Sequence, residues 1–444
     1  MKKFVLSTKY DTYPEMVDSG VDWIGKIPNG WNVVKVKNIF SISKERIKGD
    51  AKQHRIYSLT QKGLKERDIS LNDGQIAASY DAYARLREND IVLNPMDLKT
   101  GFVAKQRNDG IISPAYTNLR TFMNVDTDYY ERYFQFHYFY DIFFPFGTGV
   151  SVDFRWTLGN ETLRNFPIIS NPIVDQQKIA SFLDKRTVRI DAIIGKKKEL
   201  IDLLKEKRAA LIHHAVTKGL DPDVELVNSG LKWIGKIPKG RSVQKLAYVV
   251  TRNDGGVWGD EGDEISGVPV LRSTDIEQNG KWRKLSPAYR ILGHNESHAG
   301  LLQENDLLVT KSSGSAKHLG KTGLVSEEMG GDGYYFSNFM QRLRVNSRAS
   351  SQFVFYILNG PVGRGQIPYW GLTTSGIINL NHDLISLFQL PVPDLGEQSM
   401  IVDFLDKRTV RIDAIIEKNT KTIQLLKEYR ASLIHNAVTG KIKV

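Results

Sequence analysis

Two blocks of this 444-residue chain each occur twice. Residues 18–31 read DSGVDWIGKIPNGW, and residues 228–241 read NSGLKWIGKIPKGR. A longer block covers residues 175–216 and returns at residues 397–438, and both of its copies contain the thirteen residues FLDKRTVRIDAII. An internal repeat constrains the fold more than any local pattern, because both copies are expected to form the same structure. The chain is therefore organised as a short motif, a variable segment and a long block, all repeated once.

The long blocks are predicted to be helices that pair with each other. Their apolar residues recur in alternating steps of four and three, which is the heptad pattern of a coiled coil. The seam of the first copy consists of Leu183, Thr187, Ile190, Ile194, Lys197, Ile201, Leu204, Arg208, Leu211 and Ala215. The seam of the second copy consists of Leu405, Thr409, Ile412, Ile416, Asn419, Ile423, Leu426, Arg430, Leu433 and Ala437. About 40 residues make a helix roughly 60 Å long, which cannot bury its seam alone. In an antiparallel pair, the polar residues Lys197 and Asn419 would meet near the centre and fix the register.

The two variable segments, roughly residues 32–170 and 242–393, resemble each other only faintly. ENDIVLN at Glu88 matches ENDLLVT at Glu304, and GFVA at Gly101 matches GLVS at Gly323. These stretches read as short strands bounded by turn residues, so both segments are predicted to share one fold. The expected class is α/β (α+β), with two similar globular domains separated by two long helices in an antiparallel coiled coil. The predicted boundaries are a first motif at 1–31, a first domain at 32–172, a central helix at 173–218, a linker and second motif at 219–241, a second domain at 242–394 and a C-terminal helix at 395–444.

The charge of the chain favours a polyanionic partner. Its 61 Lys and Arg residues exceed its 50 Asp and Glu residues, and the net charge of +11 suits nucleic acid or an acidic membrane face. Cysteine is absent, which excludes disulfides, thiolate zinc sites and cysteine nucleophiles and suits a reducing cytoplasm. The N-terminal apolar run is too short for a signal peptide. Charged residues such as Glu131 and Asp141 interrupt the most apolar stretch, residues 129–147, so we expect a buried amphipathic helix and no membrane span.

No catalytic motif in the sequence is complete. GSAKHLGKT at residues 314–322 is similar to a phosphate-binding loop, but Ser315 stands where that motif requires glycine, so a basic loop near DNA is the preferred interpretation. HNESH at residues 294–298 has its glutamate one place too late for a zinc-protease helix. NPMD at residues 94–97 lacks the second proline and the aromatic residue of the amino-methyltransferase tetrapeptide. The chain is predicted to be non-catalytic and to hold neither a cofactor nor a metal.

Basic residues interleaved with aromatic ones fill both variable segments and are the candidate DNA contacts, because Lys and Arg bind phosphates and Arg can read base edges. In the first segment the candidates are Lys44, Arg46, Lys48, Arg55, Lys62, Tyr80, Tyr83, Arg85, Arg87, Lys99, Lys105 and Arg107. In the second they are Arg252, Trp258, Arg272, Lys281, Trp282, Arg283, Tyr289, Lys311, Lys317 and Lys321. The clusters carry this prediction, because any single residue could equally be a solvated surface charge.

The whole layout resembles the specificity subunit of type I restriction-modification enzymes, on the strength of the WIGKIP blocks and of the two long blocks that end in LIHHAVTKG and LIHNAVTG. The resemblance implies that the two variable segments are target recognition domains, each of which reads half of a bipartite double-stranded DNA sequence. It also implies that the coiled coil sets their spacing, and that two methyltransferase subunits and further restriction subunits dock on the chain. S-adenosylmethionine, ATP and Mg would then be bound by those partners.

The resemblance leaves several points open. Trp31 is replaced by Arg241 in the second motif, so the second block is expected to pack differently. A coiled-coil scaffold without DNA specificity is the alternative function, and a nucleotide-using enzyme built on the loop at residues 311–322 is a further one. Identical outward residues in the two long blocks are hypothesised to offer two equal docking sites, namely Asp184, Lys185, Arg189 and Asp191 with Asp406, Lys407, Arg411 and Asp413.

Overall fold

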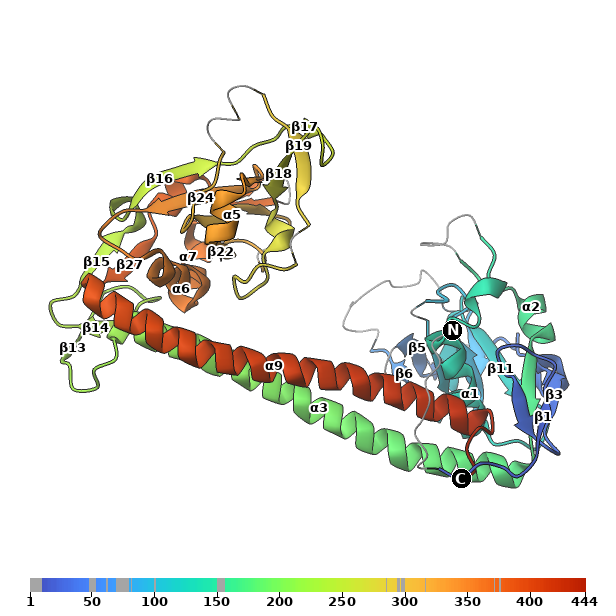
Figure 1. The fold of residues 1–444 in the computed structure, drawn as a ribbon. Coiled ribbons are helices and arrows are strands. Elements are labelled where there is room, and N and C mark those ends of the chain that lie inside the picture. The colour runs from blue at the N-terminus through green and yellow to red at the C-terminus, as the bar shows by residue number, and fades with distance from the viewer. Residues whose placement is uncertain are drawn as a thin grey trace. The chain divides into compact units, whose positions relative to one another are not determined.

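The computed structural model describes residues 10–47, 53–60, 63–68, 80, 82–99, 101–149, 156–284, 286–293, 296, 300–315, 317–370, 372–374 and 377–444. It has mixed α/β structure and divides into two compact units (Figure 1). The first unit comprises Met1–Lys198 and Lys421–Val444, and the second comprises Glu199–Thr420. Each unit therefore holds one variable segment together with part of both long helices. None of the helices in the described ranges is long and apolar enough to cross a membrane.

The first unit contains two four-stranded sheets. One has the antiparallel order β4-β11-β8-β9, with strands at Phe40–Ile42, Thr117–Thr121, Ile91–Leu93 and Val103–Lys105. The other has the order β6-β5-β10-β7, with strands at Gly63–Glu66, Ile56–Thr60, Gly110–Ile112 and Ala84–Leu86, and its β5 and β10 run parallel. The expected strands at ENDIVLN and GFVA are confirmed as β8 and β9.

Helix α1, Thr127–Phe139, is the expected buried helix in the most apolar stretch. Asp126 caps it by accepting from the backbone N–H of Tyr129, which satisfies one of the free donors of the first turn. The rings of Tyr129, Tyr130 and Phe134 are fully buried, so a broad face of this helix lies in the core, while Phe139 at its end is 55% exposed. The short helix α2, Asn160–Asn165, follows in the chain.

The second unit repeats this arrangement. Its sheet β16-β24-β20-β22 has strands at Val250–Gly255, Met340–Val345, Leu307–Thr310 and Thr322–Leu324. Its sheet β17-β19-β18-β23 has strands at Asp260–Glu261, Ala288–Ile291, Val268–Leu271 and Tyr335–Phe336, and β18 and β23 run parallel. A three-stranded sheet, β21-β26-β25, has strands at Ser312–Ser313, Ile377–Asn379 and Leu372–Thr374. Its helices are α5 at Glu327–Gly331, α6 at Ser351–Asn359, α7 at Pro361–Trp370 and α8 at His382–Ser386. The strands expected at ENDLLVT and GLVS are confirmed as β20 and β22.

The matched END motifs form the same turn in both units. Asn89 and Asn305 both have a positive φ, at 68° and 66°, a conformation that asparagine tolerates better than most residues. The following aspartates are buried and bind an arginine of the neighbouring strand, Arg120 to Asp90 at 2.8 Å and Arg344 to Asp306 at 2.7 Å. A buried carboxylate needs such a partner, so the motif fixes the same strand pair twice.

The long helices are α3, Ile173–Lys218, and α9, Leu395–Val438. In the first unit, Asp191 near the start of α3 lies 3.0 Å from Arg430 near the end of α9. In the second unit, Arg208 near the end of α3 lies 2.9 Å from Asp413 in the first half of α9. The helices are therefore antiparallel within each unit, as expected for the coiled coil. Asn419 is buried and donates to the carbonyl of Ile415, and its meeting with Lys197 stays a prediction.

The two WIGKIP motifs hold helix ends. Each forms a two-stranded sheet, β1-β2 at Met16–Asp18 and Lys26–Pro28, and β13-β14 at Leu226–Asn228 and Lys236–Pro238. Each is followed by a strand that pairs with the one before a long helix, β3-β12 at Asn32–Lys35 and Pro167–Ser170, and β15-β27 at Ser242–Lys245 and Gln389–Val392. Trp31 donates from Nε1 to Asp175 at 3.2 Å, and Arg241 binds Glu397 and also donates to the carbonyl of Thr217 at 3.0 Å. The packing at Arg241 therefore differs as expected: a charged pair with Glu397 replaces the hydrogen bond of Trp31 to Asp175, and both contacts reach the first turn of a long helix.

Candidate functional site

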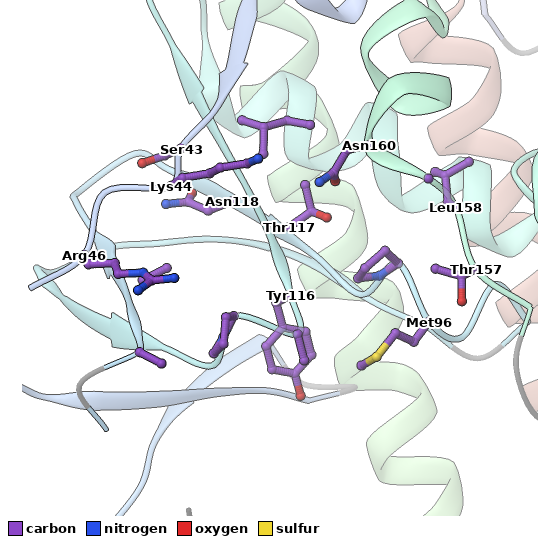
Figure 2. A pocket seen from close by; sticks show the side chains of 17 residues that line it. Ser43, Lys44, Arg46, Met96, Tyr116, Thr117, Asn118, Thr157, Leu158 and Asn160 are labelled. Carbon is purple, nitrogen blue, oxygen red and sulfur yellow. The ribbon is translucent and has the colours of Figure 1, made fainter. Parts of the chain in front are cut away.

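A hollow of about 410 Å³ lies in the first unit, where β4 and β8 end and β11 begins. Lys44 and Arg46 line it on one side, and Met96 and Thr157 line it on the other (Figure 2). Tyr116 also lines the hollow. Volumes of a few hundred Å³ are typical of ligand sites, and here two exposed cations stand beside apolar and amide groups. Of the candidate DNA contacts, the structure thus brings Lys44 and Arg46 together.

Asn118 lies in the floor of this hollow and is 1% exposed. Its Nδ2 donates to Asp90 at 2.9 Å and to the carbonyl of Arg85 at 3.2 Å, so the orientation of the amide is set by two acceptors. Its Oδ1 is buried and has no hydrogen-bond partner among the described residues. A buried acceptor of this kind is uncommon in folded proteins.

Glu45 neutralises the arginines that flank the hollow. It accepts from Arg87 at 2.9 Å and from Arg120 at 2.6 Å, and Arg85 lies 3.6 Å away. Hydrogen bonds from Arg87 and Arg120 lower the pKa of Glu45 to about 2, so the carboxylate stays charged at neutral pH. Arg85 and Arg87 therefore face a carboxylate, whereas Lys44 and Arg46 are the cations directed at the hollow.

The other candidates of the first variable segment are scattered. Lys105 forms a 2.6 Å ion pair with Asp128 and is largely buried, and Lys99 lies over the ring of Phe144. Tyr83 packs in a small core against Tyr80, which is half-buried. Arg55 and Arg107 are exposed. Lys48 and Lys62 lie outside the described residues.

Several candidates in the second variable segment also have structural roles. Arg252 pairs with Asp254, and Arg272 pairs with Asp275. Lys281 lies 3.0 Å from Asp413 of α9 and so joins the variable segment to the helix. Among the aromatic candidates, Trp282 donates from Nε1 to the carbonyl of Leu324 and packs against a core cluster, and the Tyr289 hydroxyl donates to Glu264. Arg283 and Lys317 are exposed.

Lys321 corrects one expectation from the sequence. It is buried, and its Nζ donates to the carbonyls of Ser273 and Ile276 at 2.8 and 2.7 Å. Burial lowers the pKa of Lys321, and the nearby Arg283 and Arg364 lower it further. Its ammonium therefore holds a turn together, and we assign it neither a phosphate nor a DNA contact. His294 and His298 of the HNESH motif lie outside the described residues, and no group of three or more metal-binding side chains occurs in the parts of the chain that are described.

The two aspartates of the thirteen repeated residues make corresponding contacts in both units. Asp184 pairs with Arg132 of α1, and its counterpart Asp406 accepts from the hydroxyl of Tyr356 in α6. Asp191 and Asp413 pair across to the other long helix, as described above. These four aspartates were expected to face outward as docking groups. Only Asp413 is turned away from solvent, with a side chain that is 12% exposed. The side chains of Asp184 and Asp191 are 51% and 53% exposed and Asp406 is exposed, so docking through these three stays a prediction.

A second set of repeated positions is exposed on one face of each helix. Positions i, i+3, i+4, i+7 and i+8 lie side by side on a helix. On α3 this face consists of Lys185, Val188, Arg189, Ala192 and Ile193, and on α9 it consists of Lys407, Val410, Arg411, Ala414 and Ile415. Val188 and Val410 are 68% and 60% exposed, and Ile193 and Ile415 beside them are 38% and 45% exposed. The ten residues are therefore two identical surfaces, each with two cations and an apolar stripe.

Sequence reasoning missed two glutamines that join the variable segments to the long helices. Gln176 is buried, accepts from the N–H of Asp126 at 2.8 Å and donates to the carbonyl of Asn171. Gln398 in the second unit accepts from the N–H of Ser350 at 2.8 Å and donates to the carbonyl of Pro393. Each bond reaches the cap of α1 or α6. The available signal was the glutamine shared by DQQK and EQSM at the start of both long blocks.

Comparison with known proteins agrees with this geometry. Residues 231–426 match the family described as the type I restriction modification DNA specificity domain. The type I restriction enzyme StySPI specificity subunit of Salmonella potsdam is 24% identical over 285 residues. The chain is therefore similar to type I restriction-modification specificity subunits. The EcoKI specificity subunit of Escherichia coli K12 is 22% identical over 282 residues, and each alignment covers 63% of this chain.

The matched region spans 58% of the length of both curated relatives. A solved chain from a structural study of complex assembly and conformational transition of the type I R-M system has a TM-score of 0.64 and 14% identity. That likeness covers 93% of this chain and 98% of the solved one, so the shared fold extends over both repeats.

Proposed function

We propose that this chain is the DNA-reading subunit of a type I restriction-modification complex, in which each variable segment binds one half of a bipartite duplex target. One observation carries the proposal: the same fold occurs twice and is tethered to the long helices by the same contacts, while its surface residues differ. Two copies with different surfaces suit two different half-sites. The +11 charge supplies the phosphate contacts that position such domains on DNA.

The same proposal gives the chain no catalytic step. Methyl transfer from S-adenosylmethionine, and the reactions that need ATP and Mg, belong in this proposal to the methyltransferase and restriction subunits. The role of the present chain is to place those subunits at a chosen sequence. Lys321, the lysine of the Gly-Lys-Thr end of the loop that is similar to a phosphate-binding loop, donates to backbone carbonyls, which supports this assignment of the reactions to the partner subunits.

We further propose that α3 and α9 set the distance between the half-sites. Both helices are unbroken over 46 and 44 residues, and a paired helix cannot be stretched without breaking its seam. Matched insertion of one heptad in both helices, in the complex reconstituted with the methyltransferase, tests this role by methylation mapping. The spacer is expected to change while both half-site sequences stay the same. An unchanged spacer would contradict the proposal.

The two identical helix faces support docking of two copies of one methyltransferase. Each face has two cations and two large apolar groups, so a single partner surface would fit both. Charge reversal at Arg189 or Arg411 tests this assignment, with Lys198→Glu as the control because it lies about half a turn around α3 from Arg189. Each single reversal should remove one methyltransferase copy in native mass spectrometry, and the double reversal should remove both. A complex that still binds two methyltransferase copies after the double reversal would contradict this assignment.

Duplex DNA binding separates the proposal from a pure scaffold. In the presence of the methyltransferase, the complex should select a bipartite motif with a fixed gap from a randomised duplex pool. A complex that assembles but enriches no sequence would favour the scaffold function.

A further inference from the structure

The two variable segments can be aligned by the pairing of their strands, without reference to sequence similarity. Leu119 of β11 faces Ile42 of β4 and Ile91 of β8. Leu343 of β24 faces Asn253 of β16 and Leu307 of β20. The next residues, Arg120 and Arg344, bind the buried aspartates of the END motifs, which fixes the alignment. Counting from these anchors gives the equivalent of every residue at the strand ends.

The alignment places a cation at the same point of both segments, delivered by different strands. Lys44, two residues beyond Ile42, corresponds to Gly255, two residues beyond Asn253. Glycine has no side chain there, but the Nζ of Lys311 lies so close that a Cβ on Gly255 would be 3.0 Å from it. Lys311 follows β20, and its own equivalent after β8 is Pro95. A positive charge is therefore kept at one point while the residue that supplies it has moved.

The neighbouring groups at this strand end differ in size and chemistry. In the first unit, Ser43 and Asn118 are small, and the hollow lies beside them. Their equivalents in the second unit are Asp254 and Arg342, which form a 2.7 Å ion pair with Arg342 fully buried. Burial alone would raise the pKa of Asp254, but Arg342 and Arg252 hold it below its usual value, so the pair stays charged. The interior is thus built differently beneath the same surface.

In the second unit this strand end carries exposed aromatic rings. Trp258 is 68% exposed and Phe339 is 45% exposed, and their ring centroids lie 5.9 Å apart. The backbone N–H of Lys311 donates to the carbonyl of Phe339 at 3.0 Å, which ties the cation to the aromatic pair. Exposed rings beside a cation are suited to base stacking and to contact with the thymine methyl group.

We propose that this strand end is the base-reading surface of both variable segments. It is the surface centred on Lys44, Arg46 and Asn118 in the first unit and on Lys311, Trp258 and Phe339 in the second. The inference rests on the proposed function and names the residues that carry it out. The shared cation binds a phosphate, and the groups beside it, which differ between the units, contact the bases.

The chemistry of the first surface favours particular bases. Asn118 Nδ2 is already engaged by two acceptors, so only the acceptor Oδ1 remains for a ligand. Among the described residues this buried acceptor has no partner, which costs free energy that a donor from DNA would recover. Adenine N6 and cytosine N4 carry the exocyclic amines that donate in the major groove. The first surface is therefore expected to prefer A or C at one position of its half-site.

Matched substitutions test the proposal in the complex reconstituted with its methyltransferase. The variant Lys44→Ala/Arg46→Ala should weaken binding of a randomised duplex pool at least tenfold, or relax the motif in one half only. Trp258→Ala/Phe339→Ala should do the same in the other half. Lys65→Ala is the control for the first unit, because β6 lies at the far edge of its sheet from β7, which borders the hollow. Tyr248→Ala, at a side chain that is 59% exposed, is the control for the second.

The outcomes separate this inference from the proposed function. Wild-type complex that selects no motif would remove the proposed function itself. Wild-type complex that selects a motif, with both double variants matching their controls, would overturn the assignment of the surface and leave the function intact. Variants that still assemble with the methyltransferase and show normal melting exclude misfolding as the cause of a lost half-site.

Discussion

Asp413 and Asp191 hold the same position in the two copies of the repeated thirteen residues, yet their surroundings differ. The Asp413 side chain is 12% exposed and lies 2.9 Å from Arg208 and 3.0 Å from Lys281. The Asp191 side chain is 53% exposed and lies 3.0 Å from Arg430. The same substitution, Asp→Asn, therefore removes a buried pair at one position and an exposed pair at the other, within one protein.

The expected magnitudes follow from burial. Asparagine keeps the size of the side chain, but Asp413→Asn leaves two cations without a carboxylate, and Arg208 is only 14% exposed. Hydrogen bonds to charged groups contribute about 1.5–3 kcal/mol, and breaking a fully buried pair costs about 3–5 kcal/mol. We expect Asp413→Asn to lower the free energy of unfolding by about 2–3 kcal/mol. Exposed pairs contribute about 0–1 kcal/mol, so Asp191→Asn should lie in that range.

Urea unfolding monitored by hydrogen exchange is the appropriate measurement, because the two units can unfold in separate transitions and exchange reports on each of them. The Asp413→Asn variant should lose protection in α3 and α9 within the second unit. A double-mutant cycle with Arg208→Gln should give a coupling energy of about 1–2 kcal/mol, and the matching cycle of Asp191 with Arg430→Gln should give about 0.5 kcal/mol or less. Equal coupling in the two cycles would refute the link between burial and stability here.

Three further predictions concern the tethers, the buried histidines and the charge of the chain. Replacement of Gln398 by alanine removes its hydrogen bonds to three backbone groups, and Gln176→Ala removes hydrogen bonds to two; each variant should lose about 2 kcal/mol in the same unfolding assay. The exposed neighbour Gln177→Ala should be neutral. Burial lowers the pKa of His137 to about 3 and that of His435 to about 4, below the unfolded value of about 6.5. The unfolded state therefore binds more protons in acid, and the free energy of unfolding of the first unit should fall by about 3 kcal/mol per histidine between pH 6.5 and pH 4. His435→Gln should make this dependence on pH weaker. Duplex binding by the complex should weaken linearly in log K against log salt, and a salt-independent affinity would count against phosphate contacts by the basic residues.

Much of the fold was readable because it depends on local patterns. The heptad spacing required paired helices, and the repeat required that each variable segment fold alike. The END motifs marked equivalent strands because an asparagine turn and a buried aspartate are both set within a few residues. What these patterns could not show was the direction of each charged side chain.

The partners of the charged residues were decided by tertiary structure. Lys281 finds Asp413 on a helix more than a hundred residues away in the chain, and Lys321 turns inward to two carbonyls. Both look by sequence like the surface lysines around them, because a charge carries no local mark of what it will face after folding. The cation shared by the two strand ends is the clearest case. Lys44 and Lys311 occupy unrelated places in the sequence repeat. Only the strand register shows that each lies at the equivalent point of its own unit, because a fold can preserve the position of a charge while a different residue supplies it.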